Sequence, residues 1–249
     1  MTIFAPRIST LFRSHWVAAL LVVTVQTASA QSFCSSDGQI GPTALLERFT
    51  NANCDGCWKD PATPAPQPSQ MALDWVLPGS RGDDAPLSAV ASRDGVNRLE
   101  VLGVALPDKA TSSAHIINKP KLKSSSLRVA HGLALSGYVG VSIELKANLA
   151  TTARQYQQPL TAWLVMVESV PEGTEGTSVA RNLVRNALQV NWNVRDKLSK
   201  KERSRFFESR VMSVAQGVQP DHLRVMGWVE DAKGKVLAAA QSGCTPIAR

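Results

Sequence analysis

A C-x-x-C motif at Cys54 and Cys57 is followed closely by four prolines, which lie between residues 61 and 68. A proline inside a helix costs about 3 kcal/mol, because it has no N–H to donate and its ring contacts the preceding turn. We therefore expect no long helix to begin at the cysteines. The spacing alone is typical of a redox-active dithiol, of an inert disulfide and of half a zinc site.

The N-terminal segment has the three parts of a secretory signal. These are a basic start with Arg7 and Arg13, an apolar run at residues 16–25, and small residues at 28–30. We therefore predict a signal peptide at residues 1–30 and a mature protein in the periplasm or secreted. No later stretch approaches the roughly 20 apolar residues that a spanning helix needs, so no transmembrane segment is expected after cleavage.

Removal of the signal leaves 249 − 30 = 219 residues, enough for one large domain or two small ones. The whole chain has a formal charge of +7, and the signal contains two arginines and no acidic residue, which leaves +5 for the mature protein. This mildly basic charge does not predict nucleic acid binding in an exported protein. The lysines and arginines between residues 197 and 210 are interpreted as a solvated helix face.

Four cysteines in an oxidising compartment allow three pairings. The short spacing favours a bond between Cys54 and Cys57, which leaves Cys34 to pair with Cys244. The second bond would close a loop of about 210 residues and contribute roughly 5 kcal/mol by the chain-entropy argument. We interpret it as a structural disulfide that ties the two ends of the mature chain together.

In the first half, short apolar runs predict strands at residues 44–50 and 71–77. Residues 84–102 have the pattern of a helix that Gly103 ends. Residues 107–126 are rich in Ser, Lys and Pro, which indicates a connector.

In the second half, the pattern predicts a mostly antiparallel sheet with helices packed against it. The expected strands lie at residues 127–145, 160–170, 223–230 and 235–240, and the expected helices at 178–190 and 196–214. The last two strands form a hairpin through residues 231–234.

The segment LLERFTNANCDGCWKDP, at residues 45–61, resembles the opening of a family of secreted bacterial thioredoxin-like proteins of unknown function. In that family an E-L-F-T strand precedes the C-x-x-C motif, and Glu47, Phe49 and Thr50 stand in equivalent places. A weaker likeness continues at residues 173–185 and 227–240. The resemblance implies an exported protein with a thioredoxin-like portion around the cysteines.

These observations together predict an α+β protein. After the signal at residues 1–30, a reduced thioredoxin-like α/β portion with the connector spans residues 31–126. A mostly antiparallel, β-rich portion with one or two helices spans residues 127–249.

Two alternative functions follow from the motif. In the first, Cys54 attacks a disulfide of another exported protein as a thiolate and Cys57 releases the mixed intermediate. In the second, the protein is not an enzyme but a disulfide-stapled binding or structural protein of the envelope. The sequence has neither a G-x-S-x-G element nor a glycine-rich phosphate loop, so it gives no support to a hydrolase or a nucleotide-binding protein. We expect no cofactor, and no nucleic acid partner because an exported protein meets little nucleic acid.

A zinc site is the weakest interpretation of the motif, because the distal histidines show no ligand spacing. These are His115, His131 and His222. His131 could shuttle protons if its strand approached Cys54 and Cys57, but a lone histidine is more often structural. Trp58 could line a groove for a partner, although a packed tryptophan in the core is the commoner outcome.

Overall fold

A computed structural model describes residues 34–117, 127–146, 159–192 and 205–244 of the chain. The predicted signal peptide at residues 1–30 lies outside the described residues, as do parts of the connector and of the basic cluster. Among the described residues no helix is long and apolar enough to cross a membrane.

About half of the structure is β-strand, at 49%. The strands are β1 (Cys34–Ser35), β2 (Ala44–Asn51), β3 (Gln70–Leu77), β4 (Ala110–Ile116), β5 (Leu127–His131), β6 (Tyr138–Lys146), β7 (Leu160–Val170), β8 (Arg181–Trp192), β9 (Arg205–Ser213), β10 (Leu223–Glu230), β11 (Val236–Gln241) and β12 (Gly243–Cys244). The α-helix in this part of the chain is α1 (Asp94–Leu102), and the short 3-10 turns are η1 (Gly82–Asp84), η2 (Ser88–Val90), η4 (Thr174–Gly176) and η5 (Pro220–His222).

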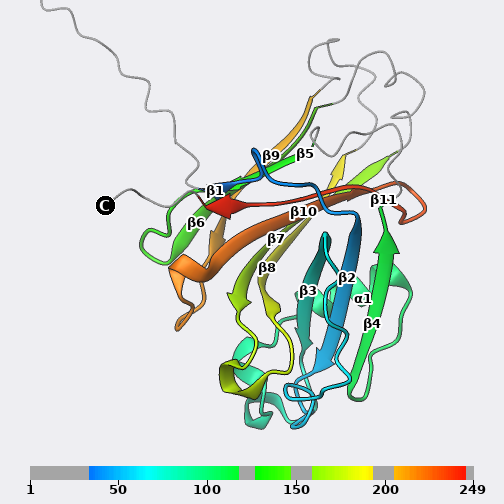
Figure 1. Ribbon diagram of the computed structural model, residues 1–249, viewed down its shortest axis with the longest axis vertical. Helices are drawn as coiled ribbons and strands as arrows, with labels where there is room; N and C mark the ends of the chain where they lie inside the picture. Colours follow the sequence, from blue (N-terminus) through cyan, green and yellow to red (C-terminus); the bar gives the residue numbers. More distant parts are fainter. Residues whose placement is uncertain (1–33, 118–126, 147–158, 193–204, 245–249) are drawn as a thin grey trace, which may run out of the picture. The chain divides into compact units, whose positions relative to one another are not determined.

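The strands form two sheets (Figure 1). The small sheet has the order β12-β1-β5-β6-β9, and all its neighbours are antiparallel. The large sheet has the order β11-β10-β7-β8-β3-β2-β4. In it β3 runs parallel to both β2 and β8, and the other neighbours are antiparallel. The large sheet thus combines strands from both sides of residue 126.

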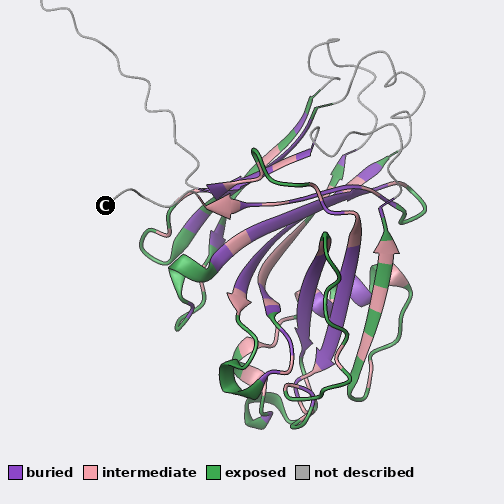
Figure 2. Ribbon diagram, in the orientation of Figure 1, coloured by how far each residue is buried: buried purple, intermediate pink, exposed green. Residues whose placement is uncertain are grey.

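Strands β2, β3 and β10 of the large sheet are buried on both faces along most of their length, and Figure 2 shows them largely in purple. In β7, Ala162 and Leu164 join a core shared with the small sheet, whereas Trp163 and Val165 join a second core that includes Leu99 of α1. Alternate side chains of a strand point to opposite faces, so a doubly covered strand reads as one continuous apolar run. The edge strand β4 alternates between exposed and half-buried residues, as expected for partial cover.

The predicted α+β class with a thioredoxin-like portion is wrong, because the fold is mostly β and consists of a five-stranded and a seven-stranded sheet. The segments expected to be helices at residues 178–190 and 196–214 contain β8 and β9 instead. β8 pairs with β7 along its whole length, from Arg181 opposite Val170 to Trp192 opposite Leu160. This long pairing overrides the weak helical preference of the sequence. Within the basic cluster, Arg205 and Arg210 lie on β9, and residues 197–204 lie outside the described part.

The helix expected at residues 84–102 is confirmed only in its last part. The chain forms η1 and η2 first, and α1 begins at Asp94. Gly103 ends α1 in the left-handed conformation, with φ 66°, and its N–H donates to the carbonyl oxygen of Glu100. The strands expected at residues 44–50, 71–77, 160–170 and 223–230 are confirmed as β2, β3, β7 and β10.

Candidate binding cleft beside the C-x-x-C loop

Cys54 and Cys57 form a disulfide in the loop that follows β2. Residues 55–59 form bends and turns, so the expectation that no long helix begins at the cysteines is confirmed. Cys57 is buried, with 8% of its surface exposed, and Cys54 is half-buried. The pair therefore lacks the helix start whose dipole acidifies the first thiol in thioredoxin-like sites.

The loop is fixed to the large sheet by a buried arginine that the sequence did not indicate. Arg181 of β8 donates hydrogen bonds to the carbonyl oxygens of Cys57 at 3.2 Å and Trp58 at 3.0 Å. Its guanidinium also lies 4.7 Å from the centre of the Trp58 ring. Arg181 thus contacts the backbone of the loop and its aromatic side chain.

Arg181 belongs to a buried cluster centred on Asp74 of β3. The Asp74 carboxylate accepts from Arg181 at 2.9 Å and from Arg48 of β2 at 2.7 Å, and all three side chains are almost inaccessible. It also accepts from the backbone N–H of Asn182 at 2.9 Å. The two cations share the single carboxylate of Asp74, and Arg48 also donates to the carbonyl oxygens of Pro64 at 2.9 Å and Ala180 at 3.0 Å. Arg48 and Asp74 interrupt the apolar runs of β2 and β3, and these charged residues could have indicated the cluster from the sequence.

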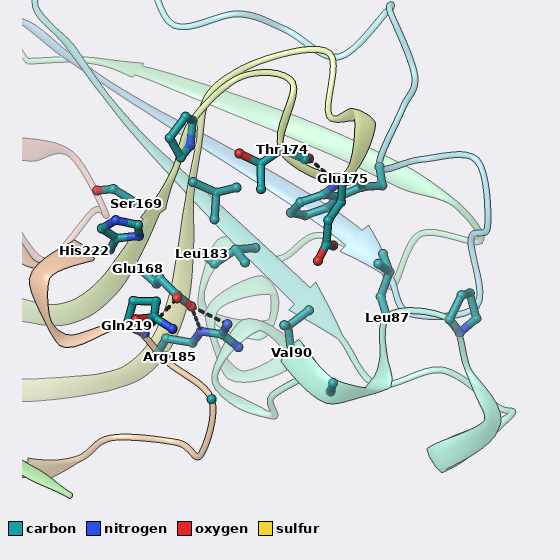
Figure 3. A pocket seen from close by; sticks show the side chains of 16 residues that line it. Leu87, Val90, Glu168, Ser169, Thr174, Glu175, Leu183, Arg185, Gln219 and His222 are labelled. Atoms are coloured by element: carbon teal, nitrogen blue, oxygen red, sulfur yellow. Dashed lines mark hydrogen bonds and ion pairs between the residues drawn. The ribbon is translucent and has the colours of Figure 1, made fainter.

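A cleft of about 510 Å³ lies next to the loop, where β7 ends and β8 begins (Figure 3). Its apolar walls come from the loop, from η2 and the residues before it, and from β7 and β8, and they include Trp58, Leu87, Val90, Val170 and Leu183. Figure 3 shows Leu87 and Val90 on one side of the cleft, with Gln219 and His222 across from them. Trp58 therefore lines a cleft and is only half-buried, which differs from the packed core position that we expected.

One ion pair lies in the wall of the cleft. Arg185 of β8 donates from Nε to a carboxylate oxygen of Glu168 at 2.9 Å, and its Nη2 contacts the same oxygen. The other oxygen of Glu168 accepts from the backbone N–H of Gln219 at 3.2 Å. Both side chains are about nine-tenths buried, at 12% and 10% exposed. The cleft thus combines apolar surface with one fixed pair of opposite charges.

The disulfide loop and the loop at η4 support each other at the rim of the cleft. The Trp58 Nε1–H donates to the carbonyl oxygen of Thr174 at 3.3 Å. Gly176, at φ 81°, leaves room for Lys59, because a Cβ there would lie 3.0 Å from the Lys59 Cε. The position of Trp58 therefore depends on both loops.

Glu47, one of the residues that carry the family resemblance, belongs to a separate buried network with Arg98 and Glu230. Arg98 of α1 contacts Glu47 and Glu230 at 2.7 Å each, and its guanidinium lies 4.9 Å and 5.2 Å from the ring centres of Trp163 and Trp228. Burial opposes the charge of Arg98, but the two glutamates outweigh it and raise the pKa of Arg98. This network links α1 to both β2 and β10, and we assign it a structural role.

The second disulfide joins Cys34 of β1 to Cys244 of β12, with a Cα–Cα distance of 4.1 Å. His131 stands opposite Cys34 on β5, so it belongs to the small sheet, whereas Cys54 and Cys57 follow a strand of the large sheet. The structure thus brings His131 together with Cys34 and Cys244 rather than with the C-x-x-C pair. No free cysteine occurs among the described residues.

Comparison with known proteins gives no assignment. A scan against models of known families and a search of curated proteins each find no match for this chain. Its two disulfides are compatible with an exported protein, because disulfides persist in oxidising compartments.

Proposed function

We propose that the protein is a non-enzymatic binding protein of the periplasm or medium, and that its cleft binds a small ligand with an apolar body and a polar end. The cleft itself carries this proposal, since its volume of about 510 Å³ falls within the roughly 300–1,000 Å³ of typical ligand sites. Its largely apolar walls and one buried ion pair, Glu168–Arg185, match the usual composition of such sites.

In this proposal the C-x-x-C disulfide is a staple that shapes the cleft. It closes the loop from which Trp58 projects, and Arg181 holds the carbonyl oxygens of the same loop. An aromatic wall that is fixed before the ligand arrives lowers the entropy lost on binding. The disulfide therefore acts on affinity through the position of Trp58.

The experiment uses 8-anilinonaphthalene-1-sulfonate, an aromatic probe with one anionic end, titrated into the purified mature protein. We expect saturable fluorescence from one probe per chain. Val90→Trp fills the cleft and should weaken binding at least tenfold, about 1.4 kcal/mol. The matched control is Val211→Trp, which adds the same ring at a position 70% exposed on β9. Equal affinities for both variants would contradict the proposal.

Thiol/disulfide exchange is the second candidate, and the unequal exposure of the two sulfur-bearing residues favours it. Cys54 is half-buried and Cys57 is buried, which is the order needed for an attacking and a resolving thiol. In the reduced protein, the Cys54 thiolate would attack a partner disulfide and expel one partner thiolate. Cys57 would then attack the Cys54 sulfur, release the second partner thiol and restore the Cys54–Cys57 disulfide.

An insulin-reduction assay with dithiothreitol tests this candidate directly. Turnover above the reagent alone, lost in Cys54→Ser, would support it. Absence of any difference between wild type and Cys54→Ser would remove the enzymatic interpretation and leave the binding proposal untouched.

A further inference from the structure

Three side chains with metal-binding atoms share one face of the small sheet. Cys34 of β1 stands directly opposite Cys244 of β12 on one side and opposite His131 of β5 on the other. Side chains that are directly opposite on neighbouring strands point to the same face. Cys34 and His131 are buried, at 1% and 5% exposed, and Cys244 is half-buried.

The ligand atoms of these residues lie close together. The two sulfurs and a ring nitrogen of His131 are all within 4.8 Å of one another. This arrangement comes from strand register, so three elements far apart in the sequence meet at one point. The sequence spacing of the histidines could not indicate it, because residues 34, 131 and 244 are brought together only by the sheet.

The imidazole of His131 is oriented as a metal ligand usually is. Its Nδ1 lies 2.8 Å from the carbonyl oxygen of Gly132, which fixes the proton on Nδ1 and leaves the lone pair on Nε2. His131 Nε2 is buried and has no hydrogen-bond partner among the described residues. A buried polar atom without a partner is uncommon and calls for an explanation, such as an ion that is bound in another state.

We propose that Cys34, Cys244 and His131 form a site for one thiophilic cation, Zn²⁺ or Cu⁺, when the Cys34–Cys244 disulfide is reduced. An external dithiol supplies two electrons and two protons, and is itself oxidised to a disulfide. The two protein thiols that result lose their protons to solvent when the cation binds, and the neutral Nε2 of His131 is the third ligand.

The donor set matches these two cations. Thiolates are soft ligands that select Cu⁺ and Zn²⁺, and an imidazole suits both metals. Two thiolates on one tetrahedral ion stand about 3.7 Å apart, given metal–sulfur distances of about 2.3 Å. The sulfurs of Cys34 and Cys244 are bonded to each other in the structure, so they must move apart after reduction to bind one cation. Zn²⁺ would bind a water as its fourth ligand, which could enter near Cys244 because this residue is half-buried. Cu⁺ is satisfied by three ligands.

The test uses a variant with Cys54→Ser and Cys57→Ser, so that Cys34 and Cys244 supply the only thiols. The protein is reduced with dithiothreitol, freed of it under nitrogen, and titrated with Zn²⁺ or Cu⁺ against a chromophoric chelator. We expect one equivalent to bind to the reduced protein and none to the oxidised protein. Binding of one cation but not the other identifies which of the two the site selects.

His131→Ala in the same background should weaken binding at least about tenfold, the lower end of the losses seen when a group supporting a metal site is removed. His115→Ala on β4 is the matched control and should leave the affinity unchanged. Circular dichroism follows the fold in each state, and bound cation should raise the melting temperature of the reduced protein. Equal affinities for His131→Ala and His115→Ala, or a reduced chain that stays unfolded with the cation present, would overturn the proposal.

Discussion

Arg181 donates a hydrogen bond of 3.2 Å to the carbonyl oxygen of Cys57, so that a strand of the large sheet holds the C-x-x-C loop in place. The same guanidinium is paired with Asp74 at 2.9 Å. The charge cluster of the sheet and the wall of the cleft are therefore connected through one side chain. Loss of this side chain should affect both stability and binding.

Arg181→Met should lower the free energy of unfolding by about 1–3 kcal/mol, because it leaves one carboxylate oxygen of Asp74 and the carbonyl oxygens of Cys57 and Trp58 without their donor. Urea unfolding of the mature protein measures this loss. The control is Arg81→Met, whose side chain is 52% exposed and lies 3.9 Å from Asp55; a change within about 0.5 kcal/mol is expected there. Equal effects of the two variants would show that the buried cluster contributes little.

The two disulfides should differ in their contribution to stability. Loop separations of 210 and 3 residues give roughly 5 kcal/mol for Cys34–Cys244 and roughly 2 kcal/mol for Cys54–Cys57 by the chain-entropy argument. Paired Cys→Ser variants at each disulfide, unfolded in urea, compare the two values. A larger loss at the short loop would contradict this account and would assign Cys54–Cys57 a global role.

Gly227 of β10 should not tolerate a side chain. A Cβ there would lie 2.8 Å from Val129 Cγ1 and 3.0 Å from the backbone oxygen of Trp163, where the two sheets pack. Gly227→Ala should therefore cost about 1–3 kcal/mol of unfolding free energy. Gly140→Ala on β6 is the matched control, since a Cβ there meets nothing within 4 Å. Thermal unfolding compares them, and similar melting temperatures would contradict the packing described.

Asp94 should make stability fall as the pH rises. Burial, opposed by a hydrogen bond from the backbone N–H of Ala187, raises the pKa of Asp94 above its usual 3.8. A group with a raised pKa in the folded state contributes stability below its unfolded pKa and loses it as the pH rises through the folded pKa. Asp94→Asn keeps an oxygen acceptor for Ala187 and removes the charge.

The unfolding free energy of Asp94→Asn minus that of wild type should therefore increase from below pH 3.8 toward neutral pH. Urea titrations at a series of pH values give this difference. A difference that decreases over the same interval would mean that the folded protein lowers the pKa of Asp94.

Strands were predictable from the sequence where both faces of a strand are covered. β7 and β10 are continuous apolar runs, and such runs leave few alternatives to a buried strand. β8 was not predictable, because half-buried and polar residues after Leu183 blur the alternation, and its long pairing with β7 decides its conformation.

The cleft could not be found from sequence in the same way. Trp58, Val90 and Leu183 come from three distant segments, and only the folded chain brings them together on one face of the large sheet. The C-x-x-C motif did mark the neighbourhood of the cleft, since its loop carries Trp58. The motif alone left a redox pair, a structural disulfide and a zinc site open.

Ligand binding at the cleft is tested most directly by the indole N–H resonances of the tryptophans in a ¹H–¹⁵N spectrum. The Trp58 Nε1–H lies at the cleft rim and donates to Thr174, whereas the Trp75 Nε1–H is buried and donates to Glu47 at 3.1 Å. On titration with 8-anilinonaphthalene-1-sulfonate, the Trp58 resonance should shift and saturate with the fluorescence, and the Trp75 resonance should stay in place. A bound probe that leaves the Trp58 resonance unmoved would contradict the account.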